Sequence, residues 1–329
     1  MYINGLGYYA PERVLDNEAL SAIIDTSDEW IRTRTGISAR RLAADGQDCS
    51  DLATEAARRA IAAAGIPLER ITHVIVGTVS GDAAFPATAS LVQSKLGIAD
   101  AMSFDLGAAC AGFLYGMEVA RGLLAVTPGA TILLVGAETL SRRVDWQDRS
   151  TCVLFGDGAG AAVLSADASA PAGRALPARL EGIVCEGGGG GELLYCHGGG
   201  THHVYRRGDA IGPEYFLHMN GQEVFKHAVR SMSGVTTRLL ERLGRSVGDI
   251  DLVVPHQANL RIIKAVLDRL GVSEEKAFLN LDKYGNTSAA SIPMALAEAV
   301  DEGVVRPGFR VLLTTFGAGL SWASALVRY

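Results

Sequence analysis

The chain has 329 residues, 48% of them hydrophobic, and a formal net charge of −6. This length suffices for two ordinary domains or for one large α/β domain with a sizeable core. The acidic balance argues against a broad surface for nucleic acid.

Targeting signals and cysteine usage predict a cytoplasmic protein. The opening stretch MYINGLGYYAPERV lacks the cationic start and apolar core of a secretory signal. We expect no apolar run of the ~18 residues that a membrane span needs. The five cysteines are odd in number, scattered and free of any CxxC pair, as reduced thiols are: Cys49, Cys110, Cys152, Cys185 and Cys196.

Strand-like apolar runs alternate with helical stretches, which predicts an α/β fold with a largely parallel sheet covered on both faces. Residues 62–77 resemble residues 241–256, and residues 131–138 resemble residues 310–317. Both pairs are separated by 179 residues, from 62 to 241 and from 131 to 310. A constant offset indicates two duplicated βα halves, 1–172 and 173–329, packed as one body.

Cys110 stands in residues 104–124, where a Gly/Ala-rich turn runs into an apolar-periodic helix. The first N–H groups of a helix have no intrahelical partner, so they favour a thiolate and can donate to an oxyanion. The alternative is a small apolar cysteine in a packed core. Partners elsewhere in the chain must decide between the two.

The repeat supplies such partners. Its offset takes Cys110 to Ala289, in a second small-residue turn that leads into a helix and contains Asn286. His256 ends a strand of the second half, and ligand sites favour crevices at the carboxyl ends of parallel strands. A surface histidine and a helix-capping asparagine are the ordinary alternatives. Their joint placement predicts a nucleophile with two polar partners.

Three motifs at these residues resemble the active-site motifs of β-ketoacyl-acyl carrier protein synthase III: AACAGF (108–113), PHQANLRII (255–263) and YGNTSAAS (284–291). Further matches follow the family order along the chain: DTSDEWIRTRTGI (25–37), AFPATA (84–89), FGDGAGAAVL (155–164), GELL (191–194), GQEVFKHAV (221–229) and FGAGLSWASALVRY (316–329). The resemblance implies a thiolase-like fold, in which two duplicated halves form a five-layer αβαβα sandwich.

The resemblance also implies a reaction that starts type II fatty acid synthesis. Cys110 takes the acyl group of an acyl-CoA, and malonyl-acyl carrier protein then loses CO2 and attacks the acyl-enzyme. His256 and Asn286 donate hydrogen bonds to the malonyl thioester oxygen. No cofactor is implied beyond the CoA thioester substrate.

One segment departs from the family. Its FGGG run supplies a backbone N–H that forms the oxyanion hole together with the N–H of Cys110. Here the run is FGAG, with Ala318 in the middle, and the donor persists if φ is negative there. Ala323 likewise stands where the family commonly has glycine.

Binding roles are also implied. Trp30 and Arg149 would hold adenine and Arg34 a phosphate, and the remaining CoA contacts would come from Asn220, Gln222 and Asn259. A local basic patch would receive the acidic carrier protein, through Lys226, Gln257 and Arg261. In a homodimer, Phe85 would close the partner's acyl pocket. Without the family, each of these is an ordinary core aromatic or a solvated helix face.

The glycine-rich segment 185–212 predicts a mobile loop that shapes the acyl pocket or its entrance. It holds four possible metal ligands, but their spacing fits no standard zinc motif and we expect no metal: Cys196, His197, His202 and His203.

Two other functions remain open at this stage. A homologue could prime a specialised-metabolite pathway, which the FGAG run and the divergent loop allow. A non-catalytic acyl-CoA-binding protein is the other alternative, and the retained Cys-His-Asn set argues against it. The starter acyl group depends on pocket volume, which the sequence does not reveal.

Overall fold

The computed structural model describes residues 1–168 and 176–329 and contains a nine-stranded sheet in the order β11-β12-β13-β8-β1-β7-β6-β4-β5. Its strands have these bounds: β1 Tyr2–Tyr9, β4 His73–Gly77, β5 Met102–Leu106, β6 Thr131–Glu138, β7 Gly158–Ser165, β8 Ala178–Gly187, β11 Leu252–Pro255, β12 Arg310–Gly317 and β13 Ser321–Arg328. Two small hairpins complete the strands: β2 Arg13–Asp16 with β3 Ala39–Leu42, and β9 Leu194–Tyr195 with β10 His218–Met219.

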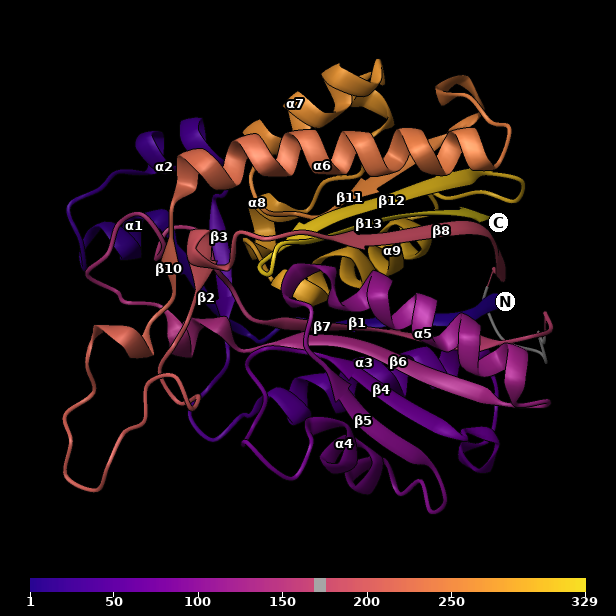
Figure 1. Cartoon of the computed structure of the whole chain (residues 1–329), viewed down its shortest axis with the longest axis horizontal. Helices are drawn as coiled ribbons and strands as arrows, with labels where there is room; N and C mark the ends of the chain where they lie inside the picture. The colour runs from indigo at the N-terminus through magenta and orange to yellow at the C-terminus, as the bar shows by residue number, and fades with distance from the viewer. Residues whose placement is uncertain (169–175) are drawn as a thin grey trace.

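The helices lie on and between two stacked parts of this sheet. Their bounds are α1 Asn17–Ser21, α2 Asp28–Thr35, α3 Cys49–Ala64, α4 Thr88–Leu96, α5 Gly112–Val126, α6 Gly221–Arg242, α7 Leu260–Leu270, α8 Leu281–Tyr284 and α9 Ser291–Asp301. In Figure 1, α6 and α7 form the upper layer, α5 and α9 the middle layer, and α3 and α4 the lower layer. The five-layer αβαβα sandwich of the thiolase-like fold is thereby confirmed.

The repeat is visible in strand register and in the turns. His73 pairs with Ile132 in the parallel pair β4–β6, and Leu252 pairs with Val311 in the parallel pair β11–β12, at the same offset of 179 residues. A 3₁₀ turn at Ala109–Ala111 leads into α5, and its counterpart at Ser288–Ala290 leads into α9. The boundary at 172/173 stays a prediction because it lies outside the described residues.

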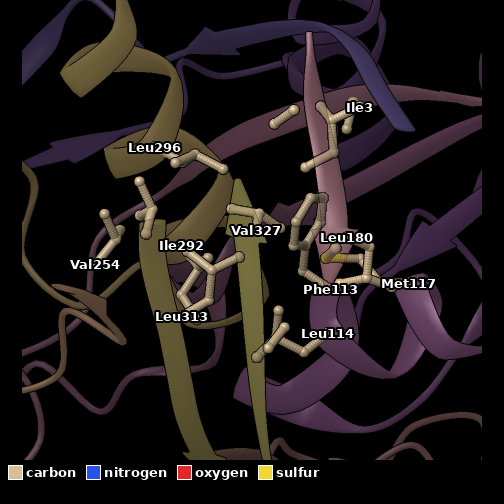
Figure 2. Packing of buried hydrophobic residues seen from close by; sticks show 14 of the residues in the cluster. Ile3, Phe113, Leu114, Met117, Leu180, Val254, Ile292, Leu296, Leu313 and Val327 are labelled. Atoms are coloured by element: carbon tan, nitrogen blue, oxygen red, sulfur yellow. The ribbon is translucent and has the colours of Figure 1, made fainter. Parts of the chain in front are cut away.

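Both halves contribute to one hydrophobic core (Figure 2). The middle helices α5 and α9 pack between the two parts of the sheet. The residues labelled in the close-up come from both halves: Ile3, Phe113, Leu114, Met117, Leu180, Val254, Ile292, Leu296, Leu313 and Val327. The turns that begin the two middle helices are therefore held on a shared rigid base.

One expectation from the sequence is wrong. The helical stretch Ala109–Val126 has 18 residues and a mean hydropathy of 1.3, so its length and composition would allow a membrane span. Its inner face, with Phe113 and Met117, is buried in the core between the sheet layers. The apolar character of this stretch is thus that of a central core helix.

Candidate active site

Cys110 lies in the turn that begins α5, where the preceding Ala109 has a φ of 44°. A positive φ costs a residue with a Cβ about 1–3 kcal/mol, so the surrounding structure must hold it. Thr315 on β12 does so, since its Oγ1 donates to the Cys110 carbonyl at 2.8 Å. A Cβ on Gly317 would lie 2.8 Å from the Cys110 nitrogen, which shows how closely the end of β12 approaches this turn.

The thiol of Cys110 is buried, with an exposed fraction of 8%. Burial raises its pKa to about 12, while a hydrogen bond with the Ser288 side chain lowers the pKa by less. The N-terminal amides of α5 act in the same direction as Ser288. The thiolate expected from the helix position is therefore not the resting form, and the thiol must lose its proton when it reacts.

His256 follows β11, and its side chain is 4% exposed. Its Nδ1 lies 2.6 Å from Ser291 Oγ at the start of α9, which leaves Nε2 as the free ring nitrogen. Burial lowers the pKa of His256 to about 3, so the ring is neutral at ordinary pH. The corresponding positions of the first half, Gly77 and Gly112, are in direct backbone contact.

Asn286 precedes the Ser288–Ala290 turn and is 6% exposed. Its backbone N–H donates to the Leu154 carbonyl at 2.8 Å. Its side-chain Oδ1 accepts from the Ser288 N–H at 2.9 Å. Because the oxygen is engaged in this way, the amide group Nδ2 is the free hydrogen-bond donor of this side chain.

The structure brings these three side chains to one cavity of about 1040 Å³. Cys110, His256 and Asn286 all line it, as the sequence predicted. Among the described residues that line it there is no aspartate or glutamate, although the chain is acidic overall. Four cations line it instead: Arg34, Arg149, Lys226 and Arg261.

Cys110 also lines a second, smaller cavity of about 360 Å³. Its wall includes Val79, Leu140 and Ala318, together with glycines of the 185–212 segment. That segment therefore borders the space beside the nucleophile. Phe85 lies elsewhere, with 86% of its surface exposed.

The residues expected to bind CoA gather around Trp30. The guanidinium of Arg149 lies 4.7 Å from the centre of its indole ring, and that of Arg34 lies 5.2 Å away. A ring sandwiched between Trp30 and Arg149 would require Arg149 to move, because the two are already stacked. The other three expected residues also line the larger cavity: Asn220, Gln222 and Asn259.

Two of these asparagines have a structural task as well. The Asn220 side chain caps α6 by accepting from the Glu223 N–H at 3.3 Å. The Asn259 side chain caps α7 by accepting from the Arg261 N–H at 2.9 Å. The caps hold the helix ends that form the mouth of the cavity.

The residues expected to meet the carrier protein separate into two groups. Lys226 and Arg261 are exposed at the mouth of the cavity, and Lys226 pairs with Glu223 at 2.7 Å. Gln257 is only 1% exposed, and its side chain is bound to the carbonyl of Pro255 and to the N–H of Asn280. Its expected contact with a protein partner is wrong, because the side chain points into the second half.

Ala318 keeps the expected backbone donor. Among the described residues other than glycine, positive φ occurs at Ala109 and Ser288, so Ala318 adopts an ordinary conformation. It lines the smaller cavity together with Cys110. The methyl group adds to the wall of that cavity and does not strain the turn.

Sequence reasoning missed three polar residues around the site. Ser291 orients His256, Ser288 contacts Cys110, and Glu138 is buried beneath Ser288. The repeat could have indicated Glu138, since the same offset takes it to Gly317, which packs on Cys110. In the described parts of the chain, no cluster of three or more His, Cys, Asp or Glu residues is arranged to hold a metal.

Comparisons with known proteins agree with this site. The family model described as "3-Oxoacyl-[acyl-carrier-protein (ACP)] synthase III" matches residues 104–181, and its C-terminal counterpart matches residues 240–329. A β-ketoacyl-[acyl-carrier-protein] synthase III of Nitratidesulfovibrio vulgaris (strain DP4) is 54% identical, with 99% of this chain and 98% of the relative covered.

Solved structures give the same result. The 3-oxoacyl-[acyl-carrier-protein] synthase III of Aquifex aeolicus is 42% identical with a TM-score of 0.88, over 99% of both chains. The synthase III of Thermus thermophilus is 45% identical with a TM-score of 0.88, over 99% of this chain and 98% of the other. The chain belongs to the β-ketoacyl-acyl carrier protein synthase III family of condensing enzymes.

Proposed function

We propose that this enzyme condenses an acyl-CoA starter with malonyl-acyl carrier protein through an acyl-Cys110 intermediate, initiating type II fatty acid synthesis. The observation that carries this proposal is the position of Cys110, which lines two cavities at once. The larger one, with its four cations, suits a CoA thioester or a carrier-bound thioester. The smaller and mainly apolar one suits the acyl group that stays behind on the thiol.

In the first stage, Cys110 attacks the thioester carbonyl of the acyl-CoA. The carbonyl oxygen becomes negative and accepts hydrogen bonds from the backbone N–H groups of Cys110 and Ala318. Such donors contribute roughly 3–4 kcal/mol each to an oxyanion transition state. Collapse of the intermediate releases CoA and leaves the acyl group on Cys110.

In the second stage, the malonyl thioester loses CO2 and negative charge develops on its carbonyl oxygen. His256 is suited to stabilise this oxygen because it is neutral: with Ser291 donating to Nδ1, its proton lies on Nε2. The free amide of Asn286 is the second donor. The resulting carbanion attacks the acyl-Cys110 carbonyl and gives a β-ketoacyl product two carbons longer than the starter.

The partners follow from the charges at the cavity mouth. The phosphates of CoA and an acidic carrier protein both need cations, and Arg34, Arg149, Lys226 and Arg261 offer them locally. We include in the proposal a cytoplasmic homodimer in which the exposed Phe85 packs against the partner subunit. The proposed reaction needs no metal or other cofactor.

Mass spectrometry tests the first stage directly. The enzyme is mixed with acetyl-CoA and with a panel of branched and longer acyl-CoAs, and the peptide that contains Cys110 is examined. We expect an acyl adduct on Cys110 and none in Cys110→Ser. Absence of an adduct with every acyl-CoA, or an adduct retained in the serine variant, would overturn the proposed role of Cys110.

A further inference from the structure

A buried carboxyl group lies behind the nucleophile. Glu138 ends β6 with no exposed surface, and no cation pairs with it in the parts of the chain that are described. One oxygen, Oε2, accepts hydrogen bonds from the Ser80 hydroxyl, from the Val79 N–H at 3.2 Å and from Thr78 Oγ1 at 3.3 Å. The other, Oε1, accepts from the Ser288 hydroxyl at 3.0 Å.

Ser288 connects this carboxyl group to the active site. It lines the smaller cavity together with Cys110, and its side chain hydrogen-bonds with the thiol. Its φ of 50° is the counterpart of the strained Ala109 in the other half. Strain of this kind is retained where the surrounding structure requires one side-chain direction. Here that direction places one hydroxyl between a carboxyl group and a thiol.

The proton of the thiol has few other routes. His256 is committed to Ser291 through Nδ1, and no hydrogen bond joins its ring to Cys110 among the described residues. Burial also holds the pKa of His256 near 3, which makes the ring a poor proton acceptor. Burial has the opposite effect on the carboxyl group and raises the pKa of Glu138 to about 7. A group with such a pKa can accept and return a proton near neutral pH.

We propose that Glu138 is a positioning residue that receives, through Ser288, the proton that Cys110 loses when it is acylated. The thiol proton moves to Ser288 Oγ while the Ser288 hydroxyl proton moves to Glu138 Oε1. This leaves a thiolate, a neutral serine that now donates to it, and a neutral carboxylic acid. After the thiolate has displaced CoA, the proton returns through Ser288 to the departing CoA thiolate, so that no net proton is gained or lost.

The charges around Glu138 make this role distinguishable from a static one. The titratable groups that face it are Cys49 from α3 and Cys110 from its turn, and the other neighbours are hydroxyl and N–H groups. The negative charge of Glu138 by itself raises the pKa of Cys110. Removing that charge would therefore speed thiolate formation if Glu138 were only a buried charge, and would slow it if Glu138 takes up the proton.

The test is the rate at which iodoacetamide alkylates Cys110 between pH 5 and pH 10, followed by mass spectrometry of the Cys110 peptide. At pH 7 we expect Glu138→Gln and Ser288→Ala each to slow alkylation about tenfold or more. The pH profile of both variants should shift to higher pH, and Glu138→Asp should recover part of the rate. Ser288→Ala leaves the other hydrogen bonds of Glu138 in place, so it remains informative if Glu138→Gln does not fold.

Thr78→Val is the matched control, since it removes a hydroxyl from Glu138 without touching the path to Cys110. Its rate should stay within about twofold of the wild type. Unchanged or faster alkylation in Glu138→Gln, or an unchanged rate in Ser288→Ala, would overturn the inference. The inference rests on the proposed acylation of Cys110, but iodoacetamide needs no acyl-CoA, so the two proposals can fail separately.

Discussion

At the scale of single residues, the site separates two kinds of hydrogen-bond donor. The backbone N–H groups of Cys110 and Ala318 lie on the side of the acyl pocket, whereas the side chains of His256 and Asn286 line the larger cavity. Acylation and decarboxylation place their negative charges on different oxygens. The two stages should therefore respond differently to substitution.

Asn286→Ala tests this separation. Its amide is the donor assigned to the malonyl thioester, so we expect decarboxylation to fall about 10²- to 10³-fold while acylation of Cys110 stays within a few-fold. The measurements are release of labelled CO2 from malonyl-carrier protein and release of CoA from the acyl-CoA in a single turnover. A loss of acylation with intact decarboxylation would contradict the assignment.

His256 also predicts a pH dependence of stability. Its pKa is about 3 in the folded protein, against an ordinary value of about 6.5 in the unfolded chain. Its contribution to stability is therefore present above pH 6.5 and is lost as the pH falls toward 3, at about 1.4 kcal/mol per pH unit. The drop in thermal midpoint between pH 7 and pH 5 should be smaller in His256→Asn than in the wild type. His202→Asn in the exposed loop is the control, and equal drops in all three proteins would refute the prediction.

At the scale of elements, much of the site was predictable because the repeat is regular. A strand end and the following turn recur at a fixed offset, so Cys110 and the segment around Asn286 could be placed opposite each other from the sequence. The inward direction of Gln257 was not predictable, since it depends on which backbone groups near Asn280 need partners. Nor were the raised pKa of the thiol and the stacking of Arg149 on Trp30, which arise from tertiary packing.

The close approach of β6 to the second turn gives an element-scale prediction. A Cβ on Gly136 would overlap the carbonyl of Ala289, so Gly136→Ala must displace the turn that holds Asn286 and Ser288. We expect a loss of 3 kcal/mol or more in unfolding free energy, typical of core overpacking at its severe end, with a fall in condensation activity. Gly122→Ala is the control, because nothing lies near that exposed position of α5 and helix propensity should leave it neutral or up to ~1 kcal/mol more stable. Denaturant unfolding of both variants makes the comparison, and equal stabilities would contradict it.

At the scale of the whole molecule, charge and core are arranged differently. The net charge is −6, yet the large cavity is lined by four cations and no described carboxylate. Local complementarity of this kind acts through steering and is screened by salt. We expect the KM for malonyl-carrier protein to rise several-fold between low salt and about 0.5 M salt while kcat changes less, and a KM independent of salt would argue against this surface.

The shared core predicts that the two halves unfold together. Phe113 in α5 and Leu296 in α9 are both buried in the same cluster, which strands of both halves complete (Figure 2). Phe113→Ala and Leu296→Ala should each cost about 2–5 kcal/mol, and each should shift one common thermal transition, because a cavity in either half weakens the same packing. Val126→Ala at the exposed end of α5 should change the midpoint little. Calorimetry that resolved two transitions, with each core variant lowering only its own, would show that the duplicated halves are independent folding units; a single shifted peak in both variants is what the interleaved core requires.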